Sequence, residues 1–292
     1  MKLTHAIPRV LVLAAVLICA GILFSPGVCF GQGAYSMWGS SSWFDWSDYR
    51  LEIDARIWLP RLMSGSIETQ GRTFDLKRDL GFNDDPEPFR ELRVEFYVDR
   101  LGIRVIVSES QHFQGLYLLA GLQPFGPLVV PSVPELQIGG TRIGVDLDVI
   151  RYPTFRFGWD VDYQKDALTF QDTGGGGQLK SKQILTTGVH ITGLPGRIRD
   201  IPIIIRGRAR FPVPYVSNNL LNSTMTDWEV SAGLRPTIWE TSLYGLSTFS
   251  VVIEAGYRSM NLDFTDTVGP ILGKGSAKAT LQGAFIQVGF VF

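Results

Sequence analysis

The most constraining feature of the sequence is an alternation of apolar and charged residues with a period of two. In residues 50–59, Arg-Leu-Glu-Ile-Asp-Ala-Arg-Ile-Trp-Leu, every odd position is apolar and nearly every even position is charged. Successive side chains of an extended chain point to opposite faces. The segment is therefore predicted to be a β-strand with one apolar face and one ionic face.

The same alternation recurs along the chain and defines ten segments. They are residues 50–59, 91–98, 103–108, 142–149, 155–163, 185–191, 203–211, 228–235, 249–258 and 284–292. Short connections are expected at 99–100, 152–153, 194–200 and 240–245. Longer ones, rich in Gly, Pro, Asn, Asp and Ser, are expected at 60–88, 114–138, 171–178, 216–225 and 263–277.

An even number of strands with alternating short and long connections is typical of bacterial outer-membrane barrels, whose short turns lie in the periplasm. We therefore predict that residues 49–292 form an all-β fold, a transmembrane antiparallel up-and-down β-barrel of about ten strands. Eight and twelve strands remain open alternatives. Both chain ends are expected in the periplasm, because the strands start and finish on the side of the short turns.

A soluble β-sandwich also alternates, so two further features favour lipid. The polar face is dense in arginine and carboxylates, with almost no lysine. Aromatic residues gather near the strand ends, where the headgroups of a bilayer would meet them. One set is Phe155, Phe249, Phe290 and Phe292, and the other is Phe113, Tyr163, Phe211, Trp228 and Tyr257.

The N-terminal residues 1–31 are predicted to be a signal peptide. Two positive charges precede an uncharged apolar run at 10–24, which is too short to span a membrane, and cleavage is expected after the small residue Gly31. Both cysteines lie in this segment, so the mature chain would hold no disulfide and no thiolate metal site. Residues 32–48 would form an aromatic periplasmic segment before the barrel.

If the ionic face lines the lumen, its charges nearly balance. Ten carboxylates stand against eleven arginines, whereas a selective pore would show one sign in excess at a constriction. Guanidinium and carboxylate groups form forked pairs, and ten strands lie close to the barrel size that side chains fill. We predict a mostly occluded lumen cross-linked by Glu52, Asp54, Arg104, Asp146, Asp160, Arg206, Arg208, Arg210 and Glu254.

Two alternatives to a structural or interaction role in the cell envelope are a narrow solute pore and a surface enzyme acting on lipid or peptide. Omptin-type surface proteases also have ten strands, but neither His112 nor His190 has the aspartate two residues away that their Asp–His pair requires. Ser110 and His112 are expected on the inward face of one strand, superficially like the barrel lipid A deacylases. The order is reversed relative to the His-x-Ser of those enzymes, so these two residues are weak catalytic candidates only.

The segment Gly71-Arg-Thr-Phe-Asp-Leu-Lys-Arg-Asp-Leu-Gly-Phe82 resembles a group of uncharacterised bacterial outer-membrane barrel proteins. In that group a Gly-Thr-x-x-Asp-Leu-x-x-Asp-Leu-Gly segment bridges the first two strands; here Arg72 interrupts the Gly-Thr pair. The resemblance implies the barrel fold and its location and carries no activity.

The expected partners follow from these features. The apolar face would contact outer-membrane lipid and lipopolysaccharide, and a final strand that ends in Phe292 is what the barrel-assembly machinery reads. A formal net charge of −1 without a basic run argues against nucleic acid. No cofactor and no metal are expected, and the protein is expected to be a monomer.

Overall fold

The computed structural model describes most of the chain after residue 48. Outside the description are residues 1–48, 70, 84, 87, 99–100, 115–133, 153, 166–167, 173–177, 181–182, 214–222, 241–247 and 268–273. The predicted signal peptide and the aromatic segment 32–48 therefore lie outside the described residues.

Ten long strands and four short ones make up the described structure. The long strands are β1 (Tyr49–Thr69), β3 (Phe89–Val98), β4 (Leu101–Gln114), β5 (Pro134–Tyr152), β6 (Phe155–Lys165), β9 (Gln183–Ile198), β10 (Ile201–Pro212), β11 (Ser223–Leu234), β13 (Thr248–Thr267) and β14 (Lys274–Val291). The short strands are β2 (Arg72–Asp75), β7 (Leu168–Asp172), β8 (Gln178–Lys180) and β12 (Thr237–Glu240). No helix among the described residues is long and apolar enough to cross a membrane.

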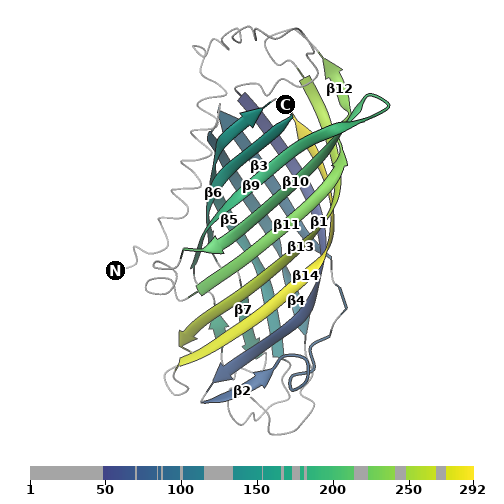
Figure 1. The fold of residues 1–292 in the computed structure, drawn as a ribbon. Coiled ribbons are helices and arrows are strands. Elements are labelled where there is room, and N and C mark those ends of the chain that lie inside the picture. The colour runs from purple at the N-terminus through teal and green to yellow at the C-terminus, as the bar shows by residue number, and fades with distance from the viewer. Residues whose placement is uncertain are drawn as a thin grey trace.

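The ten long strands close into a single antiparallel barrel, which confirms the predicted fold class (Figure 1). Each long strand pairs with its neighbours in the chain, and β1 pairs with β14 to complete the circle. Closure leaves none of these strands with an unpaired edge.

The two ends of the barrel differ. The terminal end holds the start of β1 and the end of β14, and there β9 returns as β10 through a two-residue turn in which Arg199 and Asp200 have φ of 47° and 68°. Positive φ at both central residues is the geometry that continues the twist of paired strands. The loop end holds β2 and β7, on the opposite side from the C-terminus (Figure 1).

The strands are longer at the loop end than the sequence pattern indicated. Much of the segment expected as a connection at 60–88 belongs to β1, which runs to Thr69 and pairs with β14 as far as Gly275. Likewise β5 begins at Pro134, and β13 runs to Thr267. Alternation between apolar and charged residues marks a strand only where its inward face is charged, and at the loop end the inward face is apolar.

Two β-bulges explain part of this failure. The register shifts between Leu62 and Ser64 in β1, so the inward residues change from even positions, such as Leu62, to odd ones, such as Ile67. A second shift lies between Ser108 and Gln111 in β4. An extra residue in one strand reverses which face every later side chain occupies.

The outer surface of the barrel is apolar. Large hydrophobic side chains stand 36–63% exposed along the long strands, among them Ile57, Leu92, Val145, Trp159, Ile191, Ile205, Val230, Ile253 and Ile286. Near the terminal end, Phe249 stacks on Phe290 with ring centroids 5.9 Å apart. The rings of Trp228 and Tyr257 also lie 5.9 Å apart, but both residues stand near the middle of their strands, β11 and β13, so their predicted place near the strand ends is wrong. Phe113 is 3% exposed and points into the barrel beyond the bulge in β4, so its predicted place among the outer aromatics is wrong.

The interior is layered. A large apolar cluster fills the loop end, with Trp58, Leu62 and Phe264 among its members. A small apolar cluster of Leu194, Ile204, Val252 and Val291 lies at the terminal end. Apart from Glu135 at the start of β5, the buried charged residues occupy the strand positions between these two clusters.

The connection after β2 caps the loop end and gives the Asp-Leu-x-x-Asp-Leu-Gly segment a structural role. Asp75 Oδ1 accepts hydrogen bonds from the backbone N–H groups of Lys77 and Arg78, and Asp79 Oδ2 accepts one from Asp75 N–H at 2.8 Å. Gly81 has φ of 65°, a conformation that favours glycine. The segment thus folds as a compact turn held by its own carboxylates.

The leucines of this turn close the barrel mouth. Leu76 and Leu80 are at most 1% exposed and belong to the loop-end apolar cluster. Phe82 follows them inward and its ring lies 6.1 Å from that of Phe170 on β7. The cap therefore buries apolar side chains into the barrel instead of leaving an open loop above it.

Candidate functional site: the ion-paired interior

The charged middle of the barrel is the candidate site, because it gathers nearly all buried ionisable groups of the described chain. The ten lumen carboxylates expected from the sequence are joined by Asp227, so that eleven carboxylates face eleven arginines among the described residues. The alternating faces of the ten strands place these side chains inward.

Asp227 on β11 is the centre of the largest cluster. Its carboxylate, which is 0% exposed, accepts hydrogen bonds from Arg142 at 2.9 Å, from Arg210 at 2.8 Å and from two nitrogens of Arg258 at 2.9 Å. These arginines come from β5, β10 and β13. One carboxylate thus ties three strands to its own, across the width of the barrel.

A second cluster is built on Arg104 of β4, which is also 0% exposed. Its guanidinium donates to Asp146 at 2.6 Å and to Asp162 at 2.6 Å. Arg208 contacts the same Asp146 and also Asp160, each at 3.2 Å. Planar guanidinium groups that bridge several carboxylates in this way are the geometry that favours arginine over lysine.

A third cluster lies nearer the terminal end. Arg206 of β10 contacts Glu52 at 2.5 Å and Glu254 at 3.0 Å, and the Ser231 hydroxyl donates to Glu254 at 2.9 Å. Arg206 therefore joins β1 to β13 across the interior.

Of the nine residues expected to form the lumen network, eight lie in these clusters. The exception is Asp54, which is 0% exposed and makes no hydrogen bond or ion pair with any residue that the structure describes. A Cβ placed on Gly289 would lie 1.8 Å from Asp54 Oδ1, so only glycine leaves room for this carboxyl on β14.

All three arginines of β10 are ion-paired. Arg206 contacts Glu52, and Arg208 contacts Asp146 and Asp160. Arg210 contacts Asp162 and Asp227.

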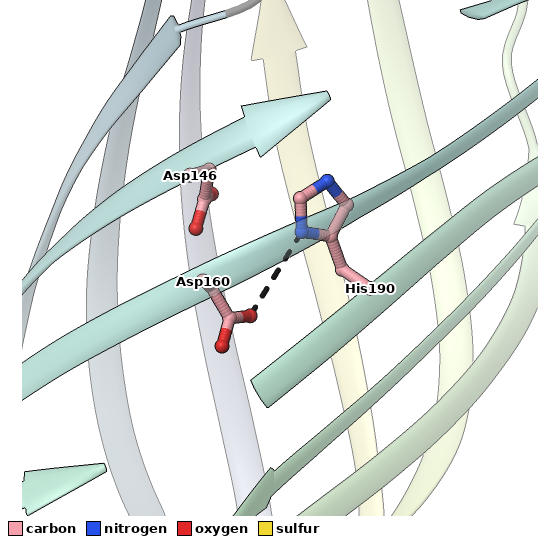
Figure 2. Close-up of side chains that lie close together, drawn as sticks. All are labelled: Asp146, Asp160 and His190. Atoms are coloured by element: carbon pink, nitrogen blue, oxygen red, sulfur yellow. Dashed lines mark ion pairs between the residues drawn. The ribbon is translucent and has the colours of Figure 1, made fainter. Parts of the chain in front are cut away.

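A candidate metal site is formed by the side chains of Asp146, Asp160 and His190, which lie close together (Figure 2). One candidate ligand atom from each lies within 4.8 Å of the others. His190 Nδ1 is 3.9 Å from Asp160 Oδ2, and its Nε2 is 3.0 Å from Asp148 Oδ1. Both carboxylates of the trio already contact Arg208, so a cation would compete with a guanidinium for the same oxygens.

The two weak catalytic candidates do not form a described pair. The side chain of Ser110 lies outside the described residues. His112 lies beyond the bulge in β4, is 45% exposed and contacts Glu135 of β5, which also accepts a hydrogen bond from Gln171 at 2.7 Å. The expectation that His112 faces inward is therefore wrong, because the bulge reverses the face on which it stands.

Two buried residues of the interior are not predicted by the alternating segments. Asp227 directly precedes Trp228, the first residue of the eighth segment, and lies two residues before Glu229 on the same inward face. The inward face of β11 therefore continues one position beyond that segment, and this continuation is the signal for Asp227. His190 pairs with Asp148 of a different strand, which its neighbours in the chain do not indicate.

No family model matches the chain, and no curated protein matches it in sequence. Solved structures do resemble it in outline. The outer-membrane protease OmpT from Escherichia coli has 9% identity and a TM-score of 0.41, over 83% of this chain and 97% of that one. The outer-membrane protein AlkL has 12% identity and a TM-score of 0.31, over 90% and 97%. A Pseudomonas aeruginosa FadL homologue has 9% identity and a TM-score of 0.25, over 84% of this chain and 89% of that one. At these values the likeness says nothing about what this chain binds or catalyses.

Proposed function

We propose that this chain is an integral protein of the bacterial outer membrane whose sealed barrel has a structural or interaction role in the cell envelope. The observation that carries the proposal is the inversion of its exposure pattern: large apolar side chains cover the outside, while arginines and carboxylates are buried inside. A water-soluble barrel has the opposite arrangement, because burying apolar surface drives its folding.

Hydrocarbon is the solvent that suits this surface. A bilayer offers no partner for backbone N–H and C=O groups, so a chain that crosses it with strands must pair all of them in a closed barrel. The described strands form such a circle, and the outward side chains of their middle parts, such as Leu147, Trp159 and Val230, are apolar.

The interior supports a closed barrel rather than a pore. Solutes would have to pass the loop-end apolar cluster with its Leu76 and Leu80 cap, and then the arginine–carboxylate clusters. Separating a buried charge from its partner in a region of low dielectric constant costs on the order of several kcal/mol. The loop-end apolar cluster and the arginine–carboxylate clusters therefore each obstruct the passage of a solute through the barrel.

The orientation and partners of the barrel are part of the proposal. The terminal end would face the periplasm, the loop end the cell exterior, and lipopolysaccharide would surround the outer half. Phe292, which packs 5.1 Å from Phe249, would present the final strand to the barrel-assembly machinery. The barrel would act as a monomer. Residues 71–82 would place the chain with the outer-membrane barrels that share its Asp-Leu-x-x-Asp-Leu-Gly segment.

Ion conductance in planar bilayers tests the sealed barrel. Purified chain, refolded in detergent and shown to be inserted by its altered gel mobility before boiling, is expected to give no steady current steps, because both layers stay closed. Lipid without protein supplies the baseline. Reproducible unitary currents from the inserted protein would contradict the proposal and favour a narrow pore.

A further inference from the structure

One carboxyl group of the ionic middle has no partner among the residues that the structure describes. Both oxygens of Asp54 on β1 are shielded from solvent, and neither accepts a hydrogen bond from those residues or forms an ion pair with them. Each of the ten other carboxylates contacts at least one arginine: Glu52, Glu91, Glu95, Asp146, Asp148, Asp160, Asp162, Asp227, Glu229 and Glu254. Asp54 is therefore the one carboxyl of the described ionic middle that no guanidinium holds.

The strands on either side of Asp54 do not supply a donor to its carboxyl. On β14 its register partner is Gly289, which has no side chain, and a Cβ there would lie 1.8 Å from Asp54 Oδ1. On β3 its register partner is Arg93, but that guanidinium donates to Glu229 at 3.2 Å and lies 3.7 Å from Glu95. The arginine beside Asp54 thus pairs with other carboxylates.

The other charged groups around Asp54 are paired as well. On β1, Glu52 precedes it by two residues and Arg56 follows it by two, so the three share the inward face. Arg56 contacts Glu229 at 2.6 Å, and Arg206 of β10 contacts Glu52 at 2.5 Å. The charges that act most strongly on Asp54 are two carboxylates and two guanidinium groups, those of Glu52, Glu95, Arg93 and Arg206. Two negative and two positive charges leave no excess to balance a third carboxylate.

An ionised carboxyl at this position would lose its hydration and gain no partner in return. A buried acid in that situation becomes neutral instead, because a protonated carboxyl group loses far less hydration than a carboxylate. We propose that Asp54 is a buried proton-binding site, whose carboxyl stays protonated in the folded barrel at neutral pH while the ten paired carboxylates are ionised. The site depends on the barrel interior alone and not on the membrane that surrounds the barrel.

The bound proton couples the stability of the barrel to pH. The folded chain keeps the proton, whereas the unfolded chain, whose aspartates are ionised at neutral pH, releases it. Stability therefore falls as the pH rises, and the release of one proton raises the unfolding equilibrium constant about tenfold per pH unit. Once the pH is high enough to ionise Asp54 in the folded barrel, an unpaired negative charge lies on β1 against β14, the strand pair that closes the barrel.

Infrared spectroscopy of the folded, detergent-solubilised chain detects the proton directly. A protonated carboxyl group has a carbonyl stretching band that ionised carboxylates lack. At neutral pH the unaltered chain is expected to show this band, and Asp54→Asn is expected to lose it. Asp263→Asn is the matched control and is expected to keep the band, because Asp263 is largely exposed and contacts Lys278 at 3.1 Å.

Urea unfolding at about pH 6 and pH 7 gives an independent measurement. Over this interval the unfolding equilibrium constant of the unaltered chain is expected to rise about tenfold more than that of Asp54→Asn, which has no proton to release. Absence of the infrared band from the unaltered chain, its persistence in Asp54→Asn, or an equal pH dependence of the two proteins overturns the proposal. The unboiled gel mobility shows whether each variant is folded. If Asp54→Asn is not, Asp54→Ala, which also lacks the carboxyl, takes its place in both measurements.

Discussion

Replacement of Asp227 by asparagine is expected to lower the free energy of unfolding of the barrel by roughly 3–5 kcal/mol, the cost typical of removing one partner from a buried ion cluster. Asp227 is fully buried and accepts hydrogen bonds from Arg142, Arg210 and Arg258. Asparagine has nearly the same shape but no charge. The three guanidinium groups would then face one another without the carboxylate that separates them.

Urea unfolding of the chain refolded into lipid vesicles, followed by tryptophan emission, measures this cost. Asp263→Asn is the matched control, because Asp263 contacts Lys278 at 3.1 Å with both side chains largely exposed. Its effect is expected to stay within about 1 kcal/mol, as for exposed pairs. Similar small losses for both variants would mean that the buried clusters contribute little to holding the strands together.

Replacement of Val230 by arginine is expected to destabilise the bilayer-inserted barrel by about 2–4 kcal/mol, the range found for a basic residue on the lipid face at the midplane. Val230 is 50% exposed, lies midway along β11 and has Gly207 and Tyr257 as its cross-strand neighbours. If the outer face met water instead, an added surface charge there would cost almost nothing.

Ile238→Arg is the control for depth. Ile238 is 60% exposed on β12, at the terminal end of the barrel, where the headgroups would lie. A basic residue near the interface costs only about 0–1 kcal/mol. Unfolding of both variants from vesicles should therefore give a much larger loss for Val230→Arg. An equal loss at the two positions would argue against a bilayer around the middle of β11.

The fold could be predicted to a large extent because one local rule governs most of it. Alternation with a period of two determines which side chains of β6 or β10 face inward, whatever the partner strands are, and sequential hairpins then leave few ways to close a sheet. The inward position of residues such as Arg104, Asp146 and Arg208 follows from this rule alone.

The rest depends on contacts that no local pattern contains. After the bulges that follow Leu62 in β1 and Ser108 in β4, the side chains that pointed inward at even positions point inward at odd ones. The alternation before each bulge does not indicate the extra residue. The loop-end interior is apolar, so β1 continues past residue 60 with apolar residues on both faces. Which arginine meets which carboxylate is set by strand register across the barrel, and for that reason the partner of Arg210 could not be derived.

Quenching by brominated lipid tests the central claim, that the apolar side chains face hydrocarbon while the interior is closed to it. Trp159 is 50% exposed on the outside of β6. Trp58 is 1% exposed inside, where its Nε1 donates to the Gly283 carbonyl at 3.2 Å and Arg258 lies over its ring. Two single-tryptophan variants are needed, one that keeps only Trp159 and one that keeps only Trp58, with phenylalanine in place of the other six tryptophans. Each is refolded into vesicles of acyl-brominated phospholipid. We predict strong quenching of Trp159 and little of Trp58. Equal quenching of the two, or none of Trp159, would contradict the account.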